Sequence, residues 1–259
     1  MTTSARRALN KVPQVTLAFW VIKICATTLG ETGGDAVSMT LKLGYVAATG
    51  IFFAVFLVTL GAQIAAKRYN PVLYWAVILS TTTVGTTMSD FLDRTAHLGY
   101  IGGSLVLVAI LVSILITWRL ALGSITFDHV SDPRVEAFYW LTITFSQTLG
   151  TALGDWMADT SGLGYLGAAG VFVAALVIVA IVYYVTSLSR VALFWAAFIL
   201  TRPLGATVGD FFDKPLNEGG LNLSRPVASA VIAAVMIAAI LLIPQRAGKY
   251  PGSALPEAR

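Results

Sequence analysis

Charged side chains are scarce in this 259-residue chain, where Asp, Glu, Lys and Arg together make up only 12% of the residues. Cysteine and histidine are scarcer still, with Cys25, His97 and His129 as the complete set. A lone cysteine cannot form an internal disulfide, and this set is too small for the thiolate and imidazole sites that Zn²⁺ and Cu⁺ favour. No basic cluster alternates with aromatic residues, which excludes a nucleic-acid-binding module. The sequence also has no catalytic triad, metal–histidine motif or phosphate-binding glycine loop, so we expect no enzyme.

Apolar residues are abundant instead, at 57% of the chain, and the mean hydropathy is +0.79. Apolar runs of about 20 residues, long enough to cross a bilayer, follow one another along the sequence. This pattern predicts an all-α integral membrane protein with eight transmembrane helices. We place the helices at residues 14–38, 44–66, 71–92, 99–120, 135–158, 164–187, 191–212 and 228–243.

A nine-residue motif rich in glycine and threonine occurs four times and ends each time on an aspartate. These aspartates are Asp35, Asp90, Asp155 and Asp210, with spacings of 55, 65 and 55 residues. With two helices per repeat, all four repeats have the same orientation, and the symmetry axis lies along the membrane normal. We expect one membrane domain at 13–245, with repeats at 13–68, 69–122, 133–188 and 189–245, between tails at 1–12 and 246–259. The longer second spacing suggests two halves of four helices each.

Basic residues fall unevenly on the two sides of the predicted helices. Eleven lie in the terminal tails and in the turns on the same side, and four lie in the opposite turns. The four are Lys42, Arg94, Lys214 and Arg225. The positive-inside rule therefore predicts that both termini are cytoplasmic and that the motif aspartates lie toward the outer side.

Small residues four apart precede each motif aspartate. Such spacing lets helix backbones approach closely in lipid, so we expect the four motif helices to meet and to bring their acids together. The small residues are Gly30 and Gly34, Gly85 and Ser89, Gly150 and Gly154, and Gly205 and Gly209.

The polar side chains of each motif follow one helix face, because they are spaced by three and four residues. Eight of the thirteen acids lie in these four stripes, and acids in a membrane span usually mark an ion or substrate path. The predicted ligands are Glu31, Asp35, Asp90, Asp93, Asp155, Asp159, Asp210 and Asp213. The supporting polar residues are Thr27, Thr82, Gln147, Thr86 and Thr151. This hard-oxygen set suits Mg²⁺, Ca²⁺, Mn²⁺ or protons.

Two cations lie within the predicted spans, Lys23 and Arg202, and we expect them to compensate charge. Arg202 is expected to pair with an acid on a neighbouring helix. Lys23 is expected to pair with Glu31 or to reach the inner membrane surface.

Ordinary helix capping is the alternative explanation for the motif, since aspartate and glycine are both common at helix ends. Two observations count against it. The second acids, Asp93, Asp159 and Asp213, are redundant as caps, and Glu31 is an acid that a cap does not need.

Aromatic residues complete the repeat: a tryptophan stands fifteen residues before each motif aspartate, and a tyrosine stands ten residues after the first three. Trp75 and Trp195 begin their helices, which predicts an aromatic belt at the inner interface. The motif residues are Trp20, Gly30, Gly34, Asp35, Tyr45, Trp75, Gly85, Asp90, Tyr100, Trp140, Gly150, Gly154, Asp155, Tyr165, Trp195, Gly205, Gly209 and Asp210. The fourth copy has Gly220 in place of the tyrosine, and the second has Ser89 in place of a glycine.

From Pro13 to Pro244, this pattern resembles a bacterial membrane-anchored protein family built of four tandem two-span repeats of unknown function. The resemblance implies a multi-pass protein of the bacterial inner membrane and supplies no activity.

The residues themselves favour a transporter of a hard divalent metal ion, with or without proton coupling. A passive cation channel with an acidic ring, or a membrane anchor or regulatory protein that transports nothing, is the alternative. The expected partners are the lipid bilayer and a metal cation or proton. The sequence is also compatible with a homo-oligomer. We expect no cofactor besides a bound divalent ion.

Overall fold

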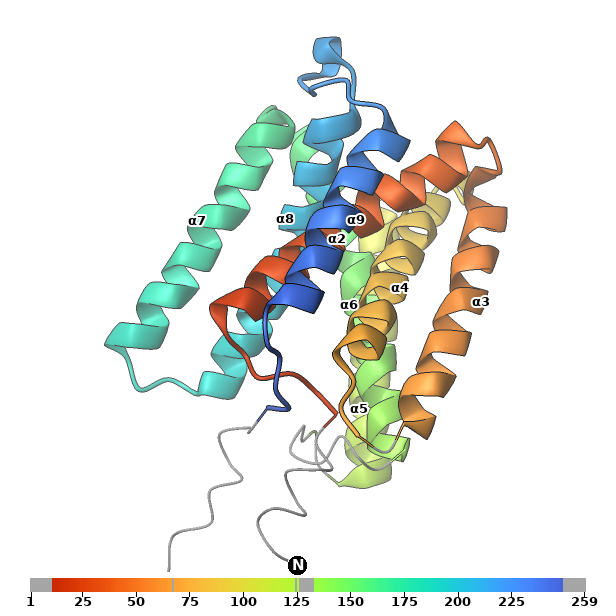
Figure 1. The fold of residues 1–259 in the computed structure, drawn as a ribbon. Coiled ribbons are helices and arrows are strands. Elements are labelled where there is room, and N and C mark those ends of the chain that lie inside the picture. Colours follow the sequence, from red (N-terminus) through yellow and green to blue (C-terminus); the bar gives the residue numbers. More distant parts are fainter. Residues whose placement is uncertain (1–10, 67, 124, 126–132, 249–259) are drawn as a thin grey trace, which may run out of the picture.

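The computed structural model describes residues 11–66, 68–123, 125 and 133–248 (Figure 1). Within these residues the chain forms eight long α-helices and no strand, which confirms the predicted helices. Most of both predicted tails and the segment 126–132 lie outside the described residues. The motif helices are α2 (Leu17–Asp35), α4 (Pro71–Asp90), α6 (Pro133–Thr160) and α8 (Arg190–Asp213). The alternating helices are α3 (Gly44–Ala65), α5 (Gly99–Leu122), α7 (Gly164–Val185) and α9 (Arg225–Leu242).

Side-chain caps begin the motif helices α2, α4 and α8. Thr16, Asn70 and Ser189 each accept a hydrogen bond from the backbone N–H three residues further on. Such a cap satisfies one of the donors that the first helical turn leaves free. At the other end, α2 and α4 pass directly into single π-helical turns, η1 (Ala36–Thr40) and η2 (Phe91–Thr95).

The turns from motif helix to alternating helix share a glycine with positive φ. Gly44, Gly99, Gly164 and Gly219 occupy the same place in the four repeats, and all have positive φ between 63° and 85°. A residue with a side chain is strained there, so each repeat keeps a glycine. A short 3₁₀ turn, η3 (Leu216–Glu218), precedes the last of them.

The four motif helices form a closed ring. α2 packs on α4, α4 on α6, α6 on α8, and α8 on α2. The alternating helices lie outside this ring, and each one packs on the motif helix of the next repeat: α3 on α4, α5 on α6, α7 on α8 and α9 on α2 (Figure 1). The two predicted halves of four helices join within this ring, because α4 and α6 are in contact like every other neighbouring pair.

Close approach through the motif glycines is what closes the ring. A Cβ on Gly30 of α2 would lie 2.2 Å from Thr82 Oγ1 of α4, and one on Gly205 of α8 would lie 2.2 Å from Thr27 Oγ1 of α2. The nearest atoms lie at 2.6 Å and 2.7 Å for Gly150 and Gly209, and at 3.1–3.2 Å for Gly34, Gly85 and Gly154. In every case the neighbour belongs to the following repeat, so the small residues lie at helix–helix contacts all round the ring.

The outer helices expose apolar surface. Within the described residues five helices are long and apolar enough to cross a membrane. Four of them are α3, α5, α7 and α9, and at most 22% of each such span is buried. The fifth is most of α8, Ala192–Asp213, of which half is buried. Such an exposed apolar coat with polar groups kept inside is typical of a protein in lipid.

Tryptophans close the end of the ring where the motif helices begin. Trp75 and Trp140 are 1% and 0% exposed, and the ring of Tyr74 lies 5.3 Å and 5.6 Å from theirs. Trp75 is therefore enclosed by protein and does not face lipid, and its depth in the membrane stays a prediction. Because neighbouring inner helices meet at this position, the indole packs inside the ring, where its Nε1 donates to Gln245 Oε1 at 2.7 Å.

Replacing Gly30 with alanine should destabilise the protein, whereas Gly33→Ala should not. The added methyl at Gly30 must displace Thr82, and overpacking of this kind costs about 1–3 kcal/mol. Gly33 lies on the same helix with nothing within 4 Å of its would-be Cβ, and alanine is the better helix former by about 1 kcal/mol. Thermal unfolding of both variants in detergent measures the difference. Equal unfolding temperatures would contradict the close contact between α2 and α4.

Candidate functional site

Three buried carboxylates meet at the end of the ring opposite the tryptophans. Glu31, Asp35 and Asp210 each place one oxygen within 4.8 Å of the other two. Glu31 and Asp35 come from the end of α2 and Asp210 from the end of α8, and these helices touch through Gly205 and Gly209. All three acids are at most 4% exposed. Burial of like charges at such distances is costly unless cations offset them.

Two cations from the fourth repeat cover this cluster. Lys214 Nζ lies 3.1 Å from Asp210 Oδ1 and 3.7 Å from Asp35 Oδ2. Arg225 Nε lies 3.1 Å from Asp213 Oδ2 and 3.6 Å from Asp35 Oδ2. Burial alone would lower the pKa of Lys214, but the carboxylates of Asp210 and Asp35 outweigh it and raise that pKa above its ordinary value. Lys214 is therefore an ammonium ion in this arrangement.

Arg202 compensates Glu31 inside the ring, as expected of a cation on a neighbouring motif helix. Its Nη1 and Nη2 both donate to Glu31 Oε2 at 3.1 Å, and Nη2 also donates to Thr86 Oγ1 at 2.7 Å. Thr86 in turn donates to Glu31 Oε2 at 3.2 Å. The guanidinium is fully buried, so three repeats share one charge-assisted network at the centre of the ring.

Lys23 behaves differently from the expectation. Its side chain is fully buried, and its Nζ donates to Gln147 Oε1 at 3.4 Å and lies 4.2 Å from the centre of the Phe198 ring. It pairs neither with Glu31 nor with the membrane surface. The reason is that Arg202 already occupies Glu31 and that the ring encloses Lys23 on all sides.

Four of the predicted ligands have a buried Oδ1 without a hydrogen-bond partner among the described residues: Asp35, Asp93, Asp155 and Asp213. Asp35 has no side-chain hydrogen bond among the described residues: its Oδ1 is buried without a partner, and both of its ion pairs are longer than 3.5 Å. Asp155, on α6, is 4% exposed, and its Oδ1 is likewise without a partner in the described chain. Buried acceptors without donors are rare in proteins and call for an explanation, one of which is an ion.

The other predicted ligands do not join the group of three. Asp90 pairs with Arg94 of its own helix at 3.2 Å, and Asp213 pairs with Arg225. Asp93 accepts a hydrogen bond from Ser89 at 3.4 Å. Asp159 is exposed and accepts from the Tyr100 hydroxyl. The eight acids thus lie around the end of the ring opposite the tryptophans, which we call the ring mouth. The group of three carboxylates comes from the first and fourth repeats only.

The supporting polar residues mostly bond to backbone carbonyls. Thr27 donates to Thr201 O of α8 and Thr82 to Ala26 O of α2, both at 3.1 Å, so these hydroxyls join neighbouring helices. Thr151 donates within its own helix. Apart from Thr86, these threonines serve helix packing rather than the carboxylate cluster.

Helix capping does not account for the first two motif aspartates. Asp35 and Asp90 occupy the boundaries between α-helix and π-helical turn, and neither side chain makes a capping hydrogen bond. The alternative reading of the motif therefore fails for these two acids.

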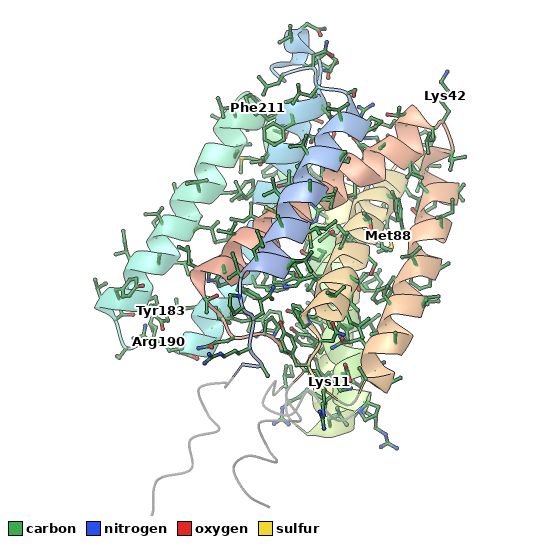
Figure 2. All side chains as sticks on the ribbon, in the orientation of Figure 1. Lys11, Lys42, Met88, Tyr183, Arg190 and Phe211 are labelled. Carbon is green, nitrogen blue, oxygen red and sulfur yellow. The ribbon has the colours of Figure 1, made fainter. Side chains whose placement is uncertain are left out.

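Sequence reasoning missed three partners, because it treated Arg94, Lys214 and Arg225 only as topology markers. Lys214 and Arg94 each follow a motif aspartate by four residues, a spacing that places them on its helix face, so this signal was readable. The sequence analysis also missed an ion pair at the other end of the protein, where the buried Lys11 (Figure 2) lies 2.8 Å from Glu136.

Comparison with protein-family models finds one family, described as Repeat of Unknown Function (DUF347), matching residues 18–69, 73–123, 138–189 and 193–247. The four-repeat organisation expected from the sequence is thereby confirmed. No significant match to the chain was found among curated proteins or among solved structures.

Removing Arg202 alone should be far more damaging than removing it together with the charge of Glu31. Arg202→Met leaves a buried carboxylate uncompensated, which costs about 3–5 kcal/mol of unfolding free energy. In the double variant Glu31→Gln/Arg202→Met that charge is gone, and a large part of the loss should be recovered. Denaturant unfolding in detergent measures both, with Arg119→Met, an exposed arginine of α5, as the control. Additive losses would show that the two side chains do not interact.

Proposed function

The chain belongs to this family of tandem repeats, and we propose that it is a membrane transporter of a hard divalent cation of the Mg²⁺, Ca²⁺ or Mn²⁺ class. Glu31, Asp35 and Asp210 bind the ion, and Asp155 from the neighbouring motif helix assists. The proposal rests above all on the three buried carboxylates, whose oxygens lie within 4.8 Å of one another, and on the unpartnered Oδ1 of Asp35.

The spacing of the three oxygens suits such an ion. Ca²⁺ takes its oxygen ligands at about 2.3–2.6 Å, so two ligands on opposite sides of it stand roughly 4.6–5.2 Å apart. The 4.8 Å within which the three carboxylate oxygens fall is compatible with this arrangement after small side-chain adjustments. All donors are oxygens, which favours hard cations over Cu⁺ and Zn²⁺.

The filled centre of the ring favours a transporter over a passive channel. Inward of the carboxylates lies the fully buried guanidinium of Arg202, and beyond it lie the buried side chain of Lys23 and the packed rings of Trp75 and Trp140. A cation moving from the carboxylates toward the other end meets positive charge first and then aromatic side chains. Passage therefore requires rearrangement of the helices, as in alternating access, rather than flow through an open pore.

The orientation of the protein in the membrane follows, in this proposal, from the excess of basic residues in the tails and in the turns on the same side. Both termini lie in the cytoplasm of a bacterial cell, the protein crosses the inner membrane, and the carboxylates face the outer side. We assign proton exchange to Glu31. Its carboxylate accepts hydrogen bonds from Arg202 and Thr86, so it must change partners when the ion binds.

Transport of Mn²⁺ and Ca²⁺ into liposomes that contain the purified full-length protein tests the proposal. Asp35→Asn and Asp210→Asn should each lower the initial rate about tenfold or more, which corresponds to a loss of about 1.4 kcal/mol or more in binding. Asp159→Asn should leave the rate unchanged, because Asp159 is exposed and lies outside the group of three.

The result that overturns the proposal is equally specific. If Asp35→Asn, Asp90→Asn, Asp155→Asn and Asp210→Asn all transport at the wild-type rate, the repeated acids are not ion ligands. If the wild-type protein moves no divalent ion at all, a non-transporting anchor becomes the better description. Flux of the ion down its own gradient that does not depend on a proton gradient would favour a channel.

A further inference from the structure

Lys214 contacts two of the three carboxylates to which the proposed function assigns the ion. Its ammonium bridges Asp210 Oδ1 and Asp35 Oδ2 at 3.1 Å and 3.7 Å, and these two acids are also members of the group of three carboxylates. The fit to Asp35 is poor, because 3.7 Å exceeds a hydrogen bond and Asp35 Oδ1 has no partner among the described residues. The ammonium thus neutralises the site without saturating it.

The backbone that carries Lys214 is held firmly by the fourth repeat. After α8 the chain folds back on the helix end: Leu221 N donates to Phe211 O at 2.7 Å, Leu223 N to Phe212 O at 2.9 Å, and Asn222 N to Lys214 O at 2.9 Å. These bonds fix where the side chain of Lys214 starts. The side chain itself is a flexible four-carbon stem that can swing away from the carboxylates.

Gly220 explains why only the fourth repeat has this arrangement. A Cβ at Gly220 would lie 2.1 Å from the carbonyl oxygen of Lys214, so no other residue fits against the folded-back chain. The same position holds Tyr45, Tyr100 and Tyr165 in the other repeats. The loss of the tyrosine in the fourth copy thus coincides with the placement of Lys214 over the site.

We propose that Lys214 is a tethered cation that competes with the transported ion for Asp35 and Asp210, and so makes the site select divalent over monovalent cations. This inference rests on the proposed function. A tethered group acts at an effective concentration of the order of millimolar or higher. A monovalent ion that replaces the ammonium gains no charge, whereas a divalent ion brings one more positive charge to three buried carboxylates, where electrostatic attraction is strong.

The experiment compares divalent binding by the full-length wild-type protein, Lys214→Met and Lys42→Met in detergent, with MnCl₂ and CaCl₂ as the probes. Isothermal titration gives the dissociation constants, and thermal unfolding shows that each variant is folded. Lys42 is the matched control: it is an exposed lysine at the same end of the protein and points away from the helices (Figure 2).

We expect Lys214→Met to bind Mn²⁺ and Ca²⁺ about tenfold more tightly than the wild type, and Lys42→Met to bind as the wild type does. Added NaCl should weaken divalent binding by Lys214→Met much more than binding by the wild type, beyond the screening seen with Lys42→Met. A purely structural role for Lys214 would lower the unfolding temperature without this gain. If Lys214→Met does not fold, Lys214→Gln tests the same expectation.

The outcomes separate this inference from the function on which it rests. Unchanged or weaker divalent affinity in a folded Lys214 variant, with binding and transport intact in the wild type, overturns the tethered competitor alone. Absence of divalent binding in the wild type and in both Lys214 variants overturns the inference and the proposed function together.

Discussion

The close contact between glycine on one motif helix and the following repeat is the constraint on which the whole arrangement depends. Gly30 meets Thr82 and Gly205 meets Thr27, and the same geometry runs round the ring. Because every motif helix presents glycines to one neighbour and larger polar side chains to the other, four copies can close only as a ring with a direction. The chain closes that ring itself, since α8 of the last repeat packs on α2 of the first. This closure brings Asp35 and Asp210, 175 residues apart in the sequence, to the same point.

A closed ring explains why the four motifs cannot be identical. The position of Glu31 recurs as Thr86, Thr151 and Ala206, and that of Thr27 as Thr82, Gln147 and Arg202. Four acids at the first position, or four arginines at the second, would place like charges together inside the ring, where repulsion and desolvation are both severe. One glutamate and one arginine instead form a single compensated pair, and threonines fill the rest. The sequence divergence between the repeats is thus a requirement of burying charge on the axis of a pseudo-symmetric assembly.

The helices and repeats were predictable because the apolar runs and the regularly spaced aspartates are visible in the linear sequence. The pairing of Arg202 with a neighbouring acid was predictable because a cation within a span needs a partner. The contacts of Lys214 and Arg225 with the carboxylate cluster were not predictable. Lys214 and Arg94 stand one helical turn after an acid, which their spacing shows, but the contact of Lys214 with Asp35 exists only because α8 and α2 are adjacent in the closed ring. The burial of Trp75 was missed for the same reason: which face of a helix is inside depends on which helices surround it. The eight acids do not all meet in one site, because the ends of four helices are too far apart for every motif to reach the same point. Each motif places its acids at its own part of the ring mouth.

The placement of the cations gives the proposed transport cycle its direction. Lys214 and Arg225 lie on the side of the cluster where the motif helices end, while Arg202 and Lys23 lie on the side toward the tryptophans. Lys214 is 8% exposed and has a flexible four-carbon side chain, so it can leave the carboxylates toward that near end. Arg202 is enclosed by Glu31, Thr86 and the backbone of α4, so release of an ion toward the tryptophans requires the Arg202–Glu31 pair to separate. On the proposed function, the exchange of ions at the mouth is therefore a side-chain movement, and passage to the other side is a movement of α8 against α2. The glycine contacts Gly205–Thr27 and Gly209–Glu31 are where that second movement must occur, because they join these two helices beside the carboxylates.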